Sequence, residues 1–141
     1  MIIAVDPGKR FYGVACFENK ILERAAYVEQ KDLKKWLGGD ELFAKAVYLE
    51  RQYLPKRHPR PMDIVDLSFA AGFVKGLVFP TNVIEYQPVT WKGNVPKEIM
   101  TKRILARLSP EEVDKIEKVG YKDHNTIDAV GIGLYALGRL H

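Results

Sequence analysis

The stretch Ile2-Ile3-Ala4-Val5-Asp6-Pro7-Gly8 places a short apolar run directly before an acid and a turn. An apolar run that stops at Asp-Pro-Gly is typical of a strand entering a tight turn. Two more strands are predicted over Phe11–Phe17 and Ile21–Val28, with Glu18-Asn19-Lys20 turning between them. Three strands joined by tight turns predict an antiparallel meander.

The rest of the chain predicts helices interleaved with strands, through helical spacing, a proline at a first helical turn and a capping pattern. We expect helices over Asp32–Leu37, Met62–Val78, Pro96 to about Leu108, Ser109 to near Gly120 and about Asn125–Leu140, strands over Phe43–Leu49 and Asn82–Tyr86, and connections over 51–61 and Pro88–Val95. This order predicts an α/β fold: one domain over residues 1–141 with a mixed five-stranded sheet (βββαβαβ) and helices on both faces.

Composition narrows the class of protein. A chain of 141 residues suits one domain, and 47% hydrophobic with 28% charged residues argues against disorder. We find no apolar run near the roughly 20 residues of a membrane span, and no basic leader before Ile2. The single cysteine, Cys16, excludes an internal disulfide and favours a reducing cytoplasm.

Positive charge gathers in the middle of the chain. Arg51–Arg107 holds ten Lys/Arg and four Asp/Glu, whereas the rest holds twelve and fourteen. A basic central segment in an otherwise near-neutral chain favours a polyanionic partner such as nucleic acid, although a solvated surface gives the same pattern.

Three acids stand at or near the ends of predicted elements. Asp6 ends the first strand, Glu50 ends the fourth, and Asp128 lies in the apolar segment Thr126–Leu134 of the last helix. Alone, each has an ordinary explanation as a turn residue, a surface ion pair or a helix-dipole partner. If the two strands are neighbours, however, the three carboxylates meet, and they would repel one another without a cation.

Clustered carboxylates suit Mg²⁺ or Mn²⁺, and the chain has no Cys or His cluster typical of zinc. Two such ions can activate water against a phosphodiester. Acids and charge together therefore predict metal-dependent hydrolysis of nucleic acid.

The motifs also resemble a known family. Ile3-Ala4-Val5-Asp6-Pro7-Gly8 with Tyr12-Gly13-Val14-Ala15, Tyr48-Leu49-Glu50, and Asp128-Ala129 before Gly131-Ile132-Gly133-Leu134 resemble the acidic motifs of RuvC-type Holliday junction resolvases; Trp91-Lys92-Gly93 with Pro96-Lys97 and Leu137-Gly138-Arg139 resemble small phage-type members. The resemblance implies an RNase H-like fold, two Mg²⁺ or Mn²⁺ per site, and a homodimer that cuts four-way DNA junctions by paired symmetric nicks in recombination and repair. It implies that Asp6, Glu50 and Asp128 are metal ligands.

The fourth acidic position departs from the family pattern. The family has Asp or His three residues before its last Asp, where this chain has Asn125. We favour Asp123 as fourth metal ligand over His124, which could instead orient or protonate near the water. Asp123 or Asn125 could also simply cap the helix.

The residues expected to contact DNA are basic or aromatic: Lys9, Arg51, Lys56, Arg57, Arg60, Trp91, Lys92 and Lys97. The loop residues among them could be merely solvated, and Trp91 could cover the core. The thin apolar helix Met62–Val78 is the candidate dimer interface, since a two-fold enzyme matches a two-fold junction.

Three other hypotheses remain open at this point. The same acids could serve an RNase H-fold nuclease acting on flaps, forks or RNA–DNA hybrids. An incomplete acidic set could mark a non-catalytic binder of branched DNA. An Asp-x-Gly hairpin also occurs in actin-like ATPases, although we find no second phosphate loop in this short chain.

Overall fold

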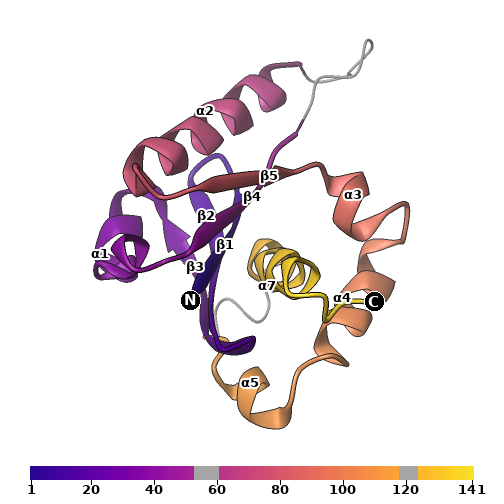
Figure 1. The fold of residues 1–141 in the computed structure, drawn as a ribbon. Coiled ribbons are helices and arrows are strands. Elements are labelled where there is room, and N and C mark those ends of the chain that lie inside the picture. Colours follow the sequence, from indigo (N-terminus) through magenta and orange to yellow (C-terminus); the bar gives the residue numbers. More distant parts are fainter. Residues whose placement is uncertain (53–60, 118–123) are drawn as a thin grey trace.

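The computed structural model describes residues 1–52, 61–117 and 124–141, and within them a five-stranded sheet has the order β3-β2-β1-β4-β5 (Figure 1). The strands are β1 (Ile2–Pro7), β2 (Phe11–Glu18), β3 (Ile21–Glu29), β4 (Ala46–Glu50) and β5 (Val83–Tyr86). The first three form the antiparallel meander, while β4 pairs in parallel with β1 and with β5. The predicted mixed sheet is confirmed.

Helices cover both faces of this sheet (Figure 1). On one face lie α1 (Leu33–Leu37), flanked by the short turns η1 (Gln30–Asp32) and η2 (Asp40–Leu42), and α2 (Pro61–Val78). On the other lie α3 (Pro88–Lys92), α4 (Lys97–Leu105), α5 (Pro110–Asp114) and α7 (His124–Ala136). Each face has its own hydrophobic core, so the sheet separates two packed layers.

Strand alternation decides which layer receives the acids. Val5 of β1 and Leu49 of β4 belong to the core beneath α1 and α2. Successive side chains of a strand point to opposite faces, so Asp6 and Glu50 point to the α7 layer. Val5 also pairs with Leu49 in the parallel register of β1 and β4. The residues that follow are therefore neighbours at the carboxyl ends of these strands.

Glycines let α7 lie close to the sheet. Gly13 of β2 pairs with Asp6, and a Cβ at Gly13 would collide with the backbone of Asn125 in the first turn of α7. A Cβ at Gly133 would likewise collide with the ring of Phe17. Close approach at Gly13 brings the first turns of α7, with Asp128, beside the end of β1.

Several boundaries differ from the sequence expectation. Residues 88–92, expected as a connection, form α3, because Pro88 suits a first helical turn and Gly93, at φ 60°, ends the helix. Strand β4 begins only at Ala46, since residues 40–42 form η2. The helix expected to continue to near Gly120 ends at Asp114, after which Ile116 pairs with Ala25 of β3.

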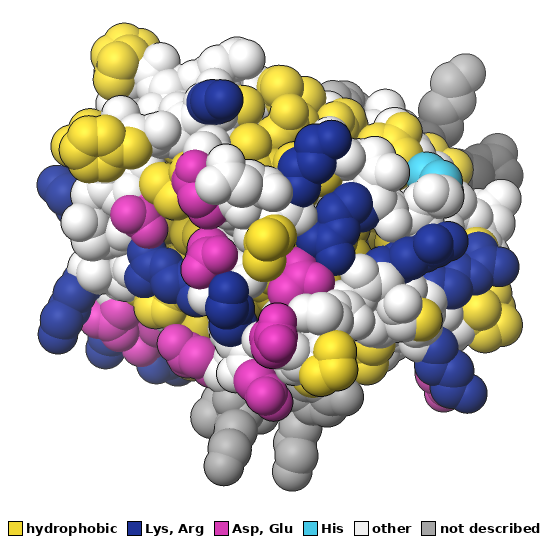
Figure 2. All heavy atoms as spheres, turned by 60° about the horizontal axis from the view of Figure 1, so that its bottom comes forward, with side chains coloured by type: hydrophobic (Ala, Val, Ile, Leu, Met, Phe, Trp, Pro, Cys, Tyr) yellow, Lys and Arg dark blue, Asp and Glu magenta, His cyan; other side chains and the backbone are white. Residues whose placement is uncertain are grey.

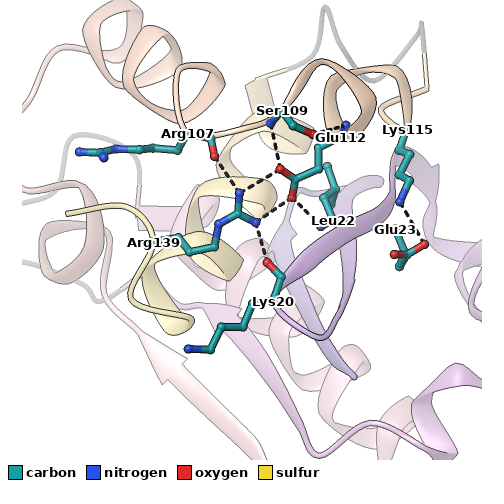
Figure 3. Close-up of polar contacts among 8 residues, drawn as sticks. All are labelled: Lys20, Leu22, Glu23, Arg107, Ser109, Glu112, Lys115 and Arg139. Carbon is teal, nitrogen blue, oxygen red and sulfur yellow. Dashed lines mark hydrogen bonds and ion pairs between the residues drawn. The ribbon is translucent and has the colours of Figure 1, made fainter.

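The carboxyl terminus is fixed by a buried ion pair between Arg139 and Glu112 (Figure 3). Helix α7 ends at Ala136, earlier than expected, and the chain turns at Gly138, whose φ is 69°. Arg139 then binds both oxygens of Glu112 at 2.7 and 2.9 Å. Further bonds join this pair to the Lys20 and Arg107 carbonyls and to the Leu22 and Ser109 amides. One side chain thus ties the terminus to α5 and to the β2–β3 turn.

Among the residues described, no helix combines the length and apolar character needed to cross a membrane.

Candidate active site

The three predicted acids come from β1, β4 and α7, on the same side of the sheet. Asp6 and Glu50 are buried, with 7% and 5% of their surface exposed, and the Asp128 side chain is 14% exposed. Carboxylates are seldom placed this deep unless they are paired or bind a metal. The arrangement therefore needs a source of positive charge.

Lys92, the last residue of α3, supplies a positive charge between them. Its Nζ donates to Asp128 Oδ2 at 3.0 Å and lies 3.5 Å from Glu50 Oε2. Burial lowers the pKa of Lys92, but the negative charges of Glu50, Asp128 and Asp6 outweigh burial and raise that pKa above its usual value. Lys92 therefore stays protonated and feels all three acids at once.

Glu50 is held at both carboxylate oxygens. Trp91 Nε1 donates to Oε2 at 2.7 Å, and Gln52 Nε2 donates to Oε1 at 3.0 Å. Burial nevertheless raises the pKa of Glu50; the Lys92 charge and the Trp91 hydrogen bond oppose that rise, while the Asp128 charge adds to it. Within the part of the chain that the structure describes, the Lys92 ammonium thus compensates Glu50 incompletely.

The donor chemistry fits a hard divalent cation. Carboxylate oxygens are the ligands that Mg²⁺ and Mn²⁺ prefer, and the Lys92 ammonium already occupies a position that favours positive charge. Within residues 1–52, 61–117 and 124–141, no three acidic, His or Cys side chains stand close enough together to bind one ion directly. In the described residues, Lys92 holds the position between Glu50 and Asp128.

A small cavity opens beside Lys92 and Asp128. It measures about 220 Å³ and is lined as well by Lys97 and His124. His124 is the exposed first residue of α7, and Lys97 is the exposed first residue of α4. Two further predicted residues thus share a pocket with Asp128, while the predicted ligand Asp123 lies outside the described residues.

The remaining predicted DNA contacts are distributed differently. Lys9 is bound by two acids of α2, to Asp63 at 2.5 Å and to Asp66 at 3.5 Å. Arg51 binds Glu85 of β5 at 2.9 Å. Both are therefore engaged within the protein, and Lys56, Arg57 and Arg60 lie outside the described residues.

The structure buries Trp91, which we expected to contact DNA. Only 1% of Trp91 is exposed, and the indole packs in the α7 layer, where a Cβ on Gly131 would collide with it. The apolar ring joins the hydrophobic core, and its N–H is used by Glu50. The sequence presented Trp91 as part of a basic connection and gave no sign of its carboxylate partner.

A basic surface near α4 was only partly predicted, since the expected DNA contacts include Lys97 but not its basic neighbours. Figure 2 shows Lys and Arg side chains with few acids on the right of the view, the side where Figure 1 places α3 and α4, whereas basic and acidic side chains are mixed further left. The exposed basic residues of this segment are Lys97, Lys102, Arg103 and Arg107. The sequence signal was the excess of positive charge over Arg51–Arg107, which includes all four of these residues.

No protein-family model matches the chain, and no curated protein matches it significantly. Solved structures do match. T. thermophilus RuvC in complex with a Holliday junction substrate is 18% identical, with a TM-score of 0.53 over 98% of this chain and 96% of that chain. The Fowlpox virus resolvase with its substrate Holliday junction DNA is 20% identical, with a TM-score of 0.60 over 98% and 99%.

The Fowlpox virus Holliday junction resolvase without DNA is 17% identical, with a TM-score of 0.55 over 97% of both chains. These likenesses define an α/β architecture of the RNase H-like class. Within that class, the chain has the fold of RuvC-type Holliday junction resolvases, as its motifs predicted.

Proposed function

We propose that this chain is a divalent-metal-dependent endonuclease that resolves four-way DNA junctions by paired symmetric nicks. The observation that carries the proposal is the contact of Glu50 and Asp128, from β4 and α7, with one half-buried ammonium, Lys92, which also feels the charge of Asp6 from β1. The fold likeness to two resolvases solved with Holliday junction DNA supports the choice of substrate.

In this proposal Asp6, Glu50, Asp128 and Asp123 hold Mg²⁺ or Mn²⁺, and two bound ions would activate the attacking water and neutralise the leaving oxygen. The protein side chains position and balance charge. Lys92, released from Glu50 and Asp128, becomes available to a phosphate oxygen of the DNA. Lys97 and the exposed basic residues of α4 hold the backbone further out.

The test is a cleavage assay on four-way junction, flap, RNA–DNA hybrid and linear duplex, with and without Mg²⁺. Asp6→Asn should abolish cleavage and leave junction binding equal or tighter, because it removes a ligand and a charge that repels DNA. Asp32→Asn is the matched control, since Asp32 is an exposed acid at the start of α1. Normal cutting by Asp6→Asn would refute the site.

The substrate panel separates the proposed activity from its alternatives. Paired nicks on the junction support resolution, single cuts on flaps or hybrids indicate another RNase H-fold nuclease, and binding without cutting indicates a branched-DNA binder. Each alternative predicts a different pattern of cleavage products across the same four substrates.

We also propose that α2 pairs with the α2 of a second copy. Its outer face is apolar and exposed: Met62 65%, Val65 41%, Phe69 76% and Phe73 38%. Gly72 and Gly76 carry open space above them, and an open depression of about 1120 Å³ lies along the helix. A two-fold dimer would match the symmetry of a four-way junction.

Analytical ultracentrifugation tests this pairing. Phe69→Lys should convert a micromolar dimer into a folded monomer, because a charge would be buried at the interface. Phe43→Lys is the matched control, since Phe43 is 78% exposed but follows η2, away from this depression. A wild-type protein that stays monomeric with junction present would refute the dimer.

A further inference from the structure

Trp91 is the most deeply buried polar partner of the candidate site. It lies on α3 with 1% of its surface exposed, and its ring packs against Ile104 and Gly131. From this position its Nε1 donates to Glu50 Oε2 at 2.7 Å. A rigid indole in a packed core has almost no freedom to turn, so the direction of this N–H is fixed by packing.

The bond defines how the Glu50 carboxylate is oriented. Gln52 Nε2 donates to the other oxygen at 3.0 Å, and the Lys92 ammonium lies 3.5 Å from the oxygen that Trp91 binds. A carboxylate oxygen can accept two bonds, so each retains capacity for another partner. Trp91 and Gln52 therefore restrain rotation of the carboxylate without saturating it.

The Trp91 ring also contacts the Lys92 ammonium. The Lys92 Nζ lies 4.9 Å from the centroid of the Trp91 ring, within the range of a cation–π contact. The same side chain thus contacts Glu50 through its N–H and Lys92 through its ring. A residue that served only to fill the core would need neither contact.

We propose that Trp91 is a positioning residue that presents the Glu50 carboxylate to a divalent cation, and that cation affinity depends on its indole N–H. This inference rests on the proposed metal-dependent function. Side chains that hydrogen-bond a ligand from behind typically change metal affinity or activity by about 10- to 100-fold when removed. Loss of the Trp91 N–H should therefore weaken Mn²⁺ binding by about tenfold or more.

The chain offers a matched control in its second tryptophan. Trp36 also directs its Nε1 at a carboxylate, Glu117, but at 3.3 Å and in an exposed setting on the opposite face of the sheet. Trp36→Phe leaves Trp91 as the one tryptophan of the chain. In that background, replacing tryptophan by 3-benzothienylalanine exchanges a single N–H for sulfur and nearly preserves the ring shape.

Calorimetry with Mn²⁺ and no DNA then measures the affinity directly. Trp36→Phe should bind Mn²⁺ as wild type does. The benzothienyl form of Trp36→Phe should bind Mn²⁺ about tenfold more weakly than its parent, and Trp91→Phe should lose at least as much Mn²⁺ affinity. Cleavage should follow the same shift in the Mn²⁺ concentration needed. Equal Mn²⁺ affinity of the two Trp36→Phe forms would overturn the inference while leaving the proposed nuclease intact, if the parent cleaves junctions.

A measurement on the natural Trp91 side chain tests the inference even if the substituted variants fail to fold. In ¹H–¹⁵N spectra the indole N–H signal that is missing from Trp36→Phe belongs to Trp36. The remaining indole signal belongs to Trp91. Mg²⁺ should shift the Trp91 signal saturably and leave the Trp36 signal in place. An unmoved Trp91 signal at Mg²⁺ concentrations that support cleavage would overturn the inference, and a wild-type protein that neither binds Mn²⁺ nor cleaves would overturn the inference and the proposed function together.

Discussion

Glu50 and Glu112 expose similarly little surface, 5% and 4%, but Glu50 lies deeper among protein atoms and the partners of the two acids differ. Arg139 binds both oxygens of Glu112 and lowers its pKa to about 2 against the opposing effect of burial, with help from two backbone amides. For Glu50, burial dominates and raises the pKa, because Lys92 is shared with Asp128. One acid is fully compensated and the other is not.

The difference separates a structural ion pair from a reactive site. In a bidentate, hydrogen-bonded pair the short N–H···O bonds offset the hydration that both charges lose on burial, and removing one partner is destabilising because the other charge is left unpaired. An incompletely compensated acid lowers stability, and such acids gather where a protein needs charge for chemistry. The comparison therefore assigns stability to the Arg139 end of the molecule and supports the proposed cation binding at the Lys92 end.

The largest expected effect is on stability at neutral pH. Glu112→Gln should lower the free energy of unfolding by about 3 kcal/mol, since it leaves Arg139 without its charge partner. Glu50→Gln should change it by less than about 1 kcal/mol, because removing an uncompensated buried charge offsets the lost bonds. Urea unfolding measures both. An equal loss in the two variants would erase the distinction between them.

The pH dependence sharpens the same distinction. A folded-state pKa of about 2 for Glu112, below the ordinary value of 4.5, means that its contribution is present above the unfolded-state pKa and lost as pH falls toward 2. The gap in unfolding free energy between wild type and Glu112→Gln should therefore narrow by about 3 kcal/mol between pH 6 and pH 2. A constant gap across that range would show that the ion pair is not its source.

Much of this architecture could be predicted from the sequence. Asp6 and Glu50 each end a short apolar strand, and parallel pairing of those strands was enough to place the acids together. The partners could not be predicted. Trp91 and Lys92 read as a basic connection, because whether a short Pro-led segment forms a helix depends on what packs behind it, here α7 and Gly131.

The same limit applies to Glu112 and Arg139. The capping pattern of Ser109 with Glu112 was visible and is present in the structure. The guanidinium that completes it comes from 27 residues further along the chain. Contacts of this length are set by how layers pack, so sequence patterns over a few residues do not reveal them.

A smaller effect is expected at Gly131, which links α7 to the site. Gly131→Ala should lower stability by about 2 kcal/mol, since its Cβ would collide with Trp91 and Ile104 in a packed core. Displacing the Trp91 ring should also weaken Mn²⁺ binding by calorimetry. Wild-type stability and Mn²⁺ affinity in this variant would contradict the close packing of α7 against α3.

The smallest effect, and the opposite sign, is expected at Gly72 in α2. A Cβ there meets nothing, and alanine loses less backbone entropy than glycine when a helix forms, so Gly72→Ala should raise monomer stability by about 0.5–1 kcal/mol. If α2 packs closely on a second copy, the added methyl should also weaken dimerisation, measured by sedimentation at falling concentration. A variant that gains stability and dimerises as wild type does would place the interface elsewhere. The added methyl would then show that no second copy packs closely on α2 at Gly72.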